Sequence, residues 1–180
     1  WEGTAKGIQP SSKVADAAAL RAEVERVTAL YEQPALIQPF LPGAEYTVTI
    51  VGHRPARALP VLQRALEAET GIGLHALDRR GVIAPDEGWS HATQGTLSGE
   101  LEAELAAAAL RAFEALGCLD FARVDFRLDA QGTPRFLEIN PLPTFAPDGS
   151  FAILAELEGR RPEALLAEVF SEALVRLGVS

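Results

Sequence analysis

The sequence predicts an α+β fold, an antiparallel sheet with flanking helices. Some short segments alternate polar and apolar residues, as half-buried strands do, whereas longer segments repeat apolar residues every three or four positions, as helices do. The helical segments alternate with strands that pair as hairpins. This order favours α+β over a doubly wound parallel sheet.

The first part of the chain predicts one helix and three strands. Apolar residues at helical spacing predict a helix over 14–31, which Pro34 ends. An apolar run predicts a short strand over 35–41. Strict alternation predicts a half-buried strand over 45–51, and a further strand is expected around 58–63.

The second part predicts an irregular excursion, a hairpin and three helices. Glycines, charges and a proline interrupt residues 67–99, where we expect one short strand at most. A helix follows over 98–116, with a glycine placed to end it. The hairpin spans 119–140, and two final helices are expected over 151–157 and 162–177.

Composition and charge exclude several function classes. The net charge is −9 and the basic residues are scattered, so a nucleic-acid partner is not expected. No apolar run approaches the roughly 18 residues of a membrane span, and we expect a soluble cytoplasmic protein. The chain of 180 residues starts with Trp1 and contains no methionine, which suggests a fragment or a processed form.

The hairpin carries an alternating polar face. A four-residue loop at 129–132 gives the predicted pairs Leu128–Thr133, Phe126–Arg135, Asp125–Phe136 and Arg123–Glu138. In that register Arg123, Asp125, Phe136 and Glu138 share one face, and Asn140 joins them if the strand continues. Asp125 and Glu138 would then be diagonal neighbours, roughly 7–8 Å apart.

Two interpretations of this face are open. Two carboxylates and the Asn140 amide form an all-oxygen ligand set that suits Mg²⁺, and Arg123 could meet a phosphoryl group. The alternative is a solvated hairpin face with a surface ion pair of little energetic weight. The metal-site interpretation depends on register, because a slip of one residue separates the two carboxylates.

Four segments resemble the ATP-grasp carboxylate–amine ligases, and D-alanine–D-alanine ligases most of all. The hairpin residues Ala122-Arg123-Val124-Asp125-Phe126 and Phe136-Leu137-Glu138-Ile139-Asn140-Pro141 carry the most specific match. Residues 2–8 resemble the glycine-rich phosphate loop of that family, and residues 37–48 its adenine hinge and ribose-binding strand. The resemblance implies that residues 1–43 complete a central ATP-grasp lobe and that residues 44–180 form the C-terminal ATP-grasp lobe.

The same resemblance implies roles for individual residues. Asp125, Glu138 and Asn140 would hold Mg²⁺ or Mn²⁺, and Arg123 would be catalytic, stabilising the acyl-phosphate and tetrahedral states. Glu45 would bind the ribose. The remaining nucleotide contacts would come from Thr4, Ala5 and Lys6 in the phosphate loop and from Gln38, Pro39, Phe40 and Leu41 at the adenine.

The implied activity is ATP-dependent ligation of small amino acid-like substrates, in cell wall biogenesis. The resemblance allows a homodimer in the parent protein and implies that this chain alone does not catalyse ligation. Two features depart from the family. Residues 74–80 lack its Lys-Tyr pair, and Pro143-Thr144 replaces a Pro-Gly pair. They leave open a nucleotide-binding module without ligase activity, or another ATP-grasp amino acid or peptide ligase.

Overall fold

The protein is built around one antiparallel sheet. The structure, a computed structural model, describes residues 8–67, 73–78, 91–92, 97–145 and 149–179. Within these residues the strand order is β4-β3-β1-β6-β7, with β2 paired to β1 and β5 to β3. The strands are β1 Glu45–Val51, β2 Arg57–Ala58, β3 Leu62–Glu67, β4 Gly73–Asp78, β5 His91–Ala92, β6 Phe121–Leu128 and β7 Pro134–Asn140.

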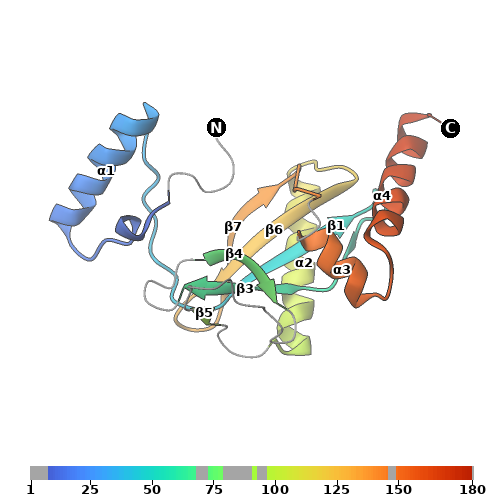
Figure 1. Ribbon diagram of the computed structural model, residues 1–180, viewed down its shortest axis with the longest axis horizontal. Coiled ribbons are helices and arrows are strands. Elements are labelled where there is room, and N and C mark those ends of the chain that lie inside the picture. The colour runs from blue at the N-terminus through green and yellow to red at the C-terminus, as the bar shows by residue number, and fades with distance from the viewer. Residues whose placement is uncertain (1–7, 68–72, 79–90, 93–96, 146–148, 180) are drawn as a thin grey trace.

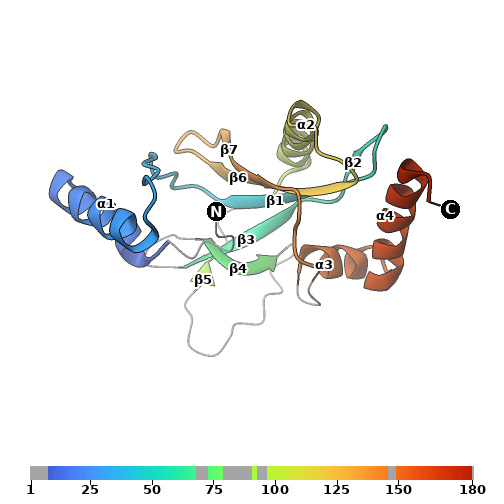
Figure 2. The same ribbon diagram turned by 90° about the horizontal axis from the view of Figure 1, so that it is seen from above.

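Helices lie at both ends of the sheet and on one of its faces (Figures 1 and 2). They are the short 3-10 helix η1 Pro10–Ser12 and the α-helices α1 Ala17–Tyr31, α2 Gly99–Ala115, α3 Ser150–Leu157 and α4 Pro162–Leu177. None of the helices within the described ranges is long and apolar enough to cross a membrane. The antiparallel sheet with flanking helices confirms the predicted fold class.

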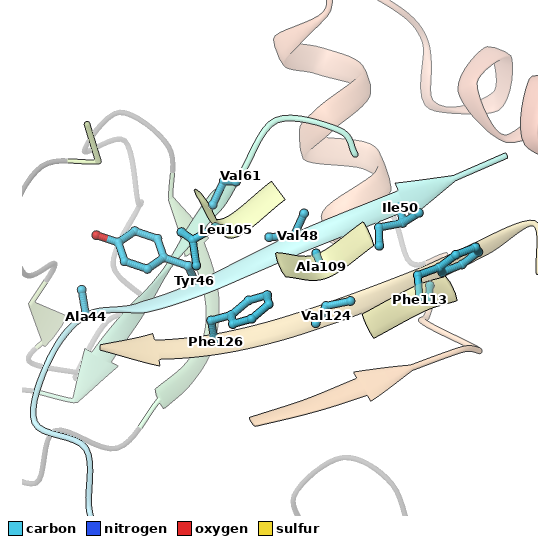
Figure 3. Packing of buried hydrophobic residues seen from close by; sticks show 11 residues of the cluster. Ala44, Tyr46, Val48, Ile50, Val61, Leu105, Ala109, Phe113, Val124 and Phe126 are labelled. Atoms are coloured by element: carbon cyan, nitrogen blue, oxygen red, sulfur yellow. The ribbon is translucent and has the colours of Figure 1, made fainter. Parts of the chain in front are cut away.

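One face of the sheet packs against α2. The central strand β1 turns Tyr46, Val48 and Ile50 to this side, where they meet Leu105 and Phe113 of the helix (Figure 3). These side chains are at most 2% exposed. Truncating a buried leucine such as Leu105 to alanine typically costs about 2–5 kcal/mol, so this layer is a main source of stability.

The opposite face is divided into an apolar end and a polar end. Val51 and Phe121 lie at the apolar end, in a second cluster with Phe151 and other residues of α3 and α4, and this cluster reaches Leu62 opposite Thr47. The α3–α4 pair therefore covers the part of this face that lies around the last residue of β1. Near the first residue of β1, this face carries charged and hydroxyl side chains instead.

Helix α1 lies apart from the other α-helices. Asp16 caps its first turn by accepting hydrogen bonds from the backbone N–H groups of Ala18 and Ala19, at 2.9 and 2.8 Å. No residue of α1 is buried. Figures 1 and 2 show it at the end of the molecule opposite α4, joined to β1 by a long segment without regular structure.

Most predicted elements are present, with three corrections. Residues 35–41 form no strand, and Leu36 and Ile37 there are 82% and 60% exposed. The single strand expected around 58–63 is two strands, β2 and β3. The excursion after β3 contains two strands, β4 and β5, where one at most was predicted.

Candidate functional site

The polar end of the sheet brings eight side chains of four strands onto the face opposite α2. We call this set the polar half-face. Its members follow from strand pairing, since directly paired residues project to the same side. They are Glu45 and Thr47 of β1, Arg64 of β3, Arg123, Asp125 and Arg127 of β6, and Glu138 and Asn140 of β7. Thr49 and Arg135, which pair with Arg123 and Arg127, project to the same side but are not counted in this set.

Asp125 lies at the centre of the polar half-face and is 4% exposed. The Thr47 hydroxyl donates to its Oδ1 at 2.7 Å. Arg123 forms a fork on both carboxylate oxygens, with Nε 3.1 Å from Oδ1 and the terminal nitrogen 2.9 Å from Oδ2. Arg64 adds a longer ion pair at 3.6 Å. A buried carboxylate is thus compensated by two guanidinium groups and one hydroxyl.

The hairpin register differs from the predicted one in two ways. Leu128 pairs with Pro134 rather than Thr133, which shifts the ladder by one residue. An irregularity between Asp125 and Phe126 then leaves Leu137 without an opposite residue and shifts the ladder again. As a result Asp125 lies directly opposite Glu138, and the predicted diagonal arrangement is wrong.

Phe136 does not belong to the polar half-face, contrary to the prediction. It pairs with Phe126, whose ring belongs to the core against α2. The two rings meet edge to face with centroids 6.1 Å apart. The predicted Arg123–Glu138 pairing is also corrected, since Arg123 lies opposite Asn140.

The oxygen donors of the hairpin fit a magnesium-type ion. Asp125 and Glu138 face each other across β6 and β7, and the Glu138 side chain is 64% exposed, open to a ligand. The Asn140 Oδ1 accepts one hydrogen bond from the Leu142 N–H at 3.0 Å and keeps a second lone pair. Two carboxylates plus an amide suit Mg²⁺, which shares its coordination with phosphate oxygens.

Arg123 lies between the two candidate metal-binding carboxylates. Besides its fork on Asp125, its terminal nitrogen is 3.7 Å from Glu138 Oε1. The guanidinium therefore occupies the position where a cation would meet both carboxylates. No cluster of three or more His, Cys, Asp or Glu that could hold a metal ion occurs among the described residues.

Glu45 forms a second buried ionic cluster beside Asp125. Its Oε1 lies 2.9 Å from Arg64 Nε and its Oε2 3.4 Å from a terminal nitrogen of Arg127. Burial raises the pKa of Glu45, and the two arginines oppose that rise. The arginines thus favour the carboxylate form, which accepts hydrogen bonds from hydroxyl groups.

The predicted adenine hinge lies next to this cluster. The Phe40 ring has Lys13 Nζ 4.1 Å and the Arg127 guanidinium carbon 4.9 Å from its centroid. Gln38 and Pro39 are exposed and Leu41 is half-buried, so hinge side chains and backbone are open to a ligand. Thr4, Ala5 and Lys6 lie outside the described residues.

Gly43 fixes the junction between the hinge and β1. Its N–H donates to the Leu128 carbonyl at 3.0 Å, and a Cβ at this position would lie 2.7 Å from that oxygen.

We expect Gly43→Ala to lower the free energy of unfolding by about 1–3 kcal/mol, measured by urea titration, because the strand ends must separate. Gly99→Ala is the control, since nothing lies within 4 Å of a Cβ there. An equal loss in both variants would contradict the prediction.

Three members of the polar half-face were not identified as site residues from the sequence. Thr47 and Arg127 lie on strands whose alternation was recognised, so their shared face was available as a signal. Arg64 lies one residue beyond the predicted strand around 58–63. Its approach to Glu45 and Asp125 depends on the pairing of β1 with both β3 and β6, which has no local sequence signal.

The antiparallel sheet with flanking helices is the fold of D-alanine–D-alanine ligase C-terminal ATP-grasp domains. A family profile described as "D-ala D-ala ligase C-terminus" matches residues 2–171. The chain therefore belongs to the D-alanine–D-alanine ligase C-terminal family, which confirms the resemblance seen in the sequence.

Individual relatives agree with this assignment. The chain is 29% identical to a D-alanine–D-alanine ligase of Cupriavidus pinatubonensis over 188 residues, covering 98% of this chain and 51% of that protein. The D-alanine–D-alanine ligase of Coxiella burnetii matches with a TM-score of 0.68 and 20% identity, over 91% of this chain and 40% of that one. The ATP complex of the Bacillus anthracis D-alanine–D-alanine ligase matches with a TM-score of 0.63 and 23% identity, over 89% of this chain and 47% of that one. The chain spans about half the length of the curated relative.

Proposed function

We propose that the chain is the nucleotide- and metal-binding part of an ATP-dependent carboxylate–amine ligase most like D-alanine–D-alanine ligase. One observation carries the proposal. Arg123, Asp125 and Glu138 converge on one face of a β-ribbon, beside Glu45 and the hinge. In this proposal residues 1–43 belong to the central lobe and residues 44–180 to the C-terminal lobe. The names and the ATP complex of the relatives support it.

Each residue has a distinct task in the proposed reaction. The substrate carboxylate attacks the γ-phosphorus of ATP, ADP leaves, and an amine then displaces phosphate from the acyl carbon and loses a proton. Arg123 stabilises the charge on the transferred phosphoryl group and on the tetrahedral oxygen. Glu45 accepts hydrogen bonds from the ribose, and the hinge residues Gln38, Pro39, Phe40 and Leu41 surround the base.

The metal-binding residues complete the proposed site. Asp125, Glu138 and Asn140 would hold Mg²⁺ or Mn²⁺, which supplies positive charge against the nucleotide phosphates. Thr4, Ala5 and Lys6 would contact the phosphates from the glycine-rich loop. The proposal also places the protein in the cytoplasm and in cell wall biogenesis, with small amino acid-like substrates and a homodimeric parent protein.

The test is phosphate release by the full-length protein with Mg-ATP and candidate amino acids, D-alanine first. We expect amino acid-dependent phosphate release from the full-length protein and none from the 180-residue chain alone, because the chain spans about half of its relative. ATP binding without phosphate release under any amino acid would contradict ligation.

Two alternatives remain as outcomes of this test. ATP binding without turnover would identify a nucleotide-binding module, which the missing Lys-Tyr pair at 74–80 favours. Turnover with other amino acids or peptides but not with D-alanine would identify a different ATP-grasp ligase. The Pro143-Thr144 pair, which replaces the Pro-Gly pair of the family shortly after β7, favours a different ATP-grasp ligase.

A further inference from the structure

Arg127 is a buried cation for which the family resemblance implies no role. Its side chain is 8% exposed, two positions along β6 from Asp125. Burial lowers the pKa of Arg127, which reflects the cost of desolvating its charge. A cation held at such a cost needs compensating contacts, and these contacts point to its role.

Three contacts of Arg127 lie along the segment that runs from the hinge to the first residue of β1. Its Nε donates to the Gly43 carbonyl at 3.2 Å, and a terminal nitrogen lies 3.4 Å from Glu45 Oε2. Its guanidinium carbon is 4.9 Å from the centroid of the Phe40 ring. One planar group thus contacts the proposed base wall, the hinge backbone and the proposed ribose carboxylate.

Charge neutralisation alone does not explain this arrangement. Arg64 already pairs with the other oxygen of Glu45 at the shorter distance of 2.9 Å. Arg127 restrains the orientation of the Glu45 carboxylate, because the guanidinium is rigid and planar and its N–H donors point in fixed directions. With the plane held by Gly43 and Phe40, the position of Glu45 Oε2 relative to the hinge is fixed as well.

We propose that Arg127 is a positioning residue for the part of the site that binds the nucleoside. It holds the Glu45 carboxylate in a fixed place relative to the Phe40 ring, so that the ribose and the base can bind at the same time. This inference rests on the proposed function, in which Glu45 binds the ribose. Arg127 touches neither the ribose nor the reacting atoms and acts through Glu45.

The test compares ATP with 2′,3′-dideoxy-ATP, which lacks the hydroxyls that Glu45 would bind. Dissociation constants are measured by calorimetry on the full-length protein with Mg²⁺. We expect the normal protein to prefer ATP by about tenfold or more, as for a hydrogen bond to a charged group. In Arg127→Met the preference should fall to about twofold, while the affinity for dideoxy-ATP changes little.

Two further variants separate positioning from folding. Arg127→Lys keeps the charge beside Glu45 but lacks the fork, so we expect an intermediate preference even if Arg127→Met folds poorly. Arg135→Met removes a 57% exposed guanidinium directly opposite Arg127 and should leave the preference unchanged. In a Glu45→Gln background, Arg127→Met should reduce the preference no further.

The outcomes are distinct. Equal weakening of ATP and dideoxy-ATP in the Arg127 variants would show a merely structural role and overturn the inference. An unchanged preference would overturn it too, while leaving ATP binding and the proposed function intact. Failure of the normal full-length protein to bind ATP would instead overturn the proposed function, and this inference with it.

Discussion

Asp125→Asn is expected to lower the Mn²⁺ affinity of the full-length protein by at least about 10- to 100-fold and to destabilise the fold. Loss of groups that only support a metal ligand already costs this much affinity. The variant also takes a buried anion from Arg123 and Arg64, which lie 2.9 and 3.6 Å from it. Breaking such a pair costs about 3 kcal/mol. Electron paramagnetic resonance of free Mn²⁺ and urea unfolding measure the two effects.

Glu138→Gln is the matched control for this variant. Glu138 is the opposite carboxylate of the same pair, but its side chain is 64% exposed. We expect a comparable loss of Mn²⁺ affinity with a stability change within about 0.5 kcal/mol, as for a surface substitution. Normal Mn²⁺ binding in both variants would show that the hairpin is not the metal site.

Arg123→Gln is expected to change metal binding and catalysis in opposite directions. Without nucleotide, the Arg123 fork covers both oxygens of Asp125 and reaches Glu138, so the guanidinium competes with a cation. Its removal should raise Mn²⁺ affinity in the absence of nucleotide. Ligation by the full-length protein should fall by about 10²- to 10³-fold, because a donor to the transition state is lost.

Arg135→Gln controls for a general change in charge. Arg135 lies on the same hairpin, but its guanidinium pairs with Asp129 at 2.7 Å. Neither Mn²⁺ affinity nor ligation should change in this variant. Weaker Mn²⁺ binding by Arg123→Gln would contradict the competition between the arginine and the metal.

The shared face of the hairpin was predicted from the sequence, but for a register that the structure corrects. The ladder is shifted by one residue at the loop and by another at Leu137. Because strand side chains alternate, two shifts of one residue restore the original face. Asp125 and Glu138 therefore lie on the same side although each predicted partner was wrong. Local alternation could not reveal the irregularity, which involves one unpaired residue.

Long helices and alternating strands were predictable because their periodicity is local. The helix over 162–177 and the strand over 45–51 have the predicted bounds. Residues 35–41 show the limit of this approach. Their apolar side chains suggest a strand, but a strand also needs a paired neighbour, and the chain there has no regular structure and is mostly exposed. The resemblance instead assigns residues 37–48 to the hinge and ribose-binding strand, an assignment that stays a prediction.

The convergence of two arginines on Glu45 was beyond sequence reasoning for a different reason. Arg64 and Arg127 converge on Glu45 from two strands that flank β1 on opposite sides. Such a cluster depends on which strands are neighbours and in what register. Neither property is encoded by the spacing of residues along one strand.

The separation of the two carboxylates from the loop has a practical consequence for engineering this hairpin. Three residue pairs, Phe126–Phe136, Arg127–Arg135 and Leu128–Pro134, separate the two carboxylates from the connection at 129–132. Its residues Ala130, Gln131 and Gly132 are exposed at a loop tip. We expect peptide tags or fluorophore attachment points introduced there to leave the pairing of Asp125 with Glu138 in place.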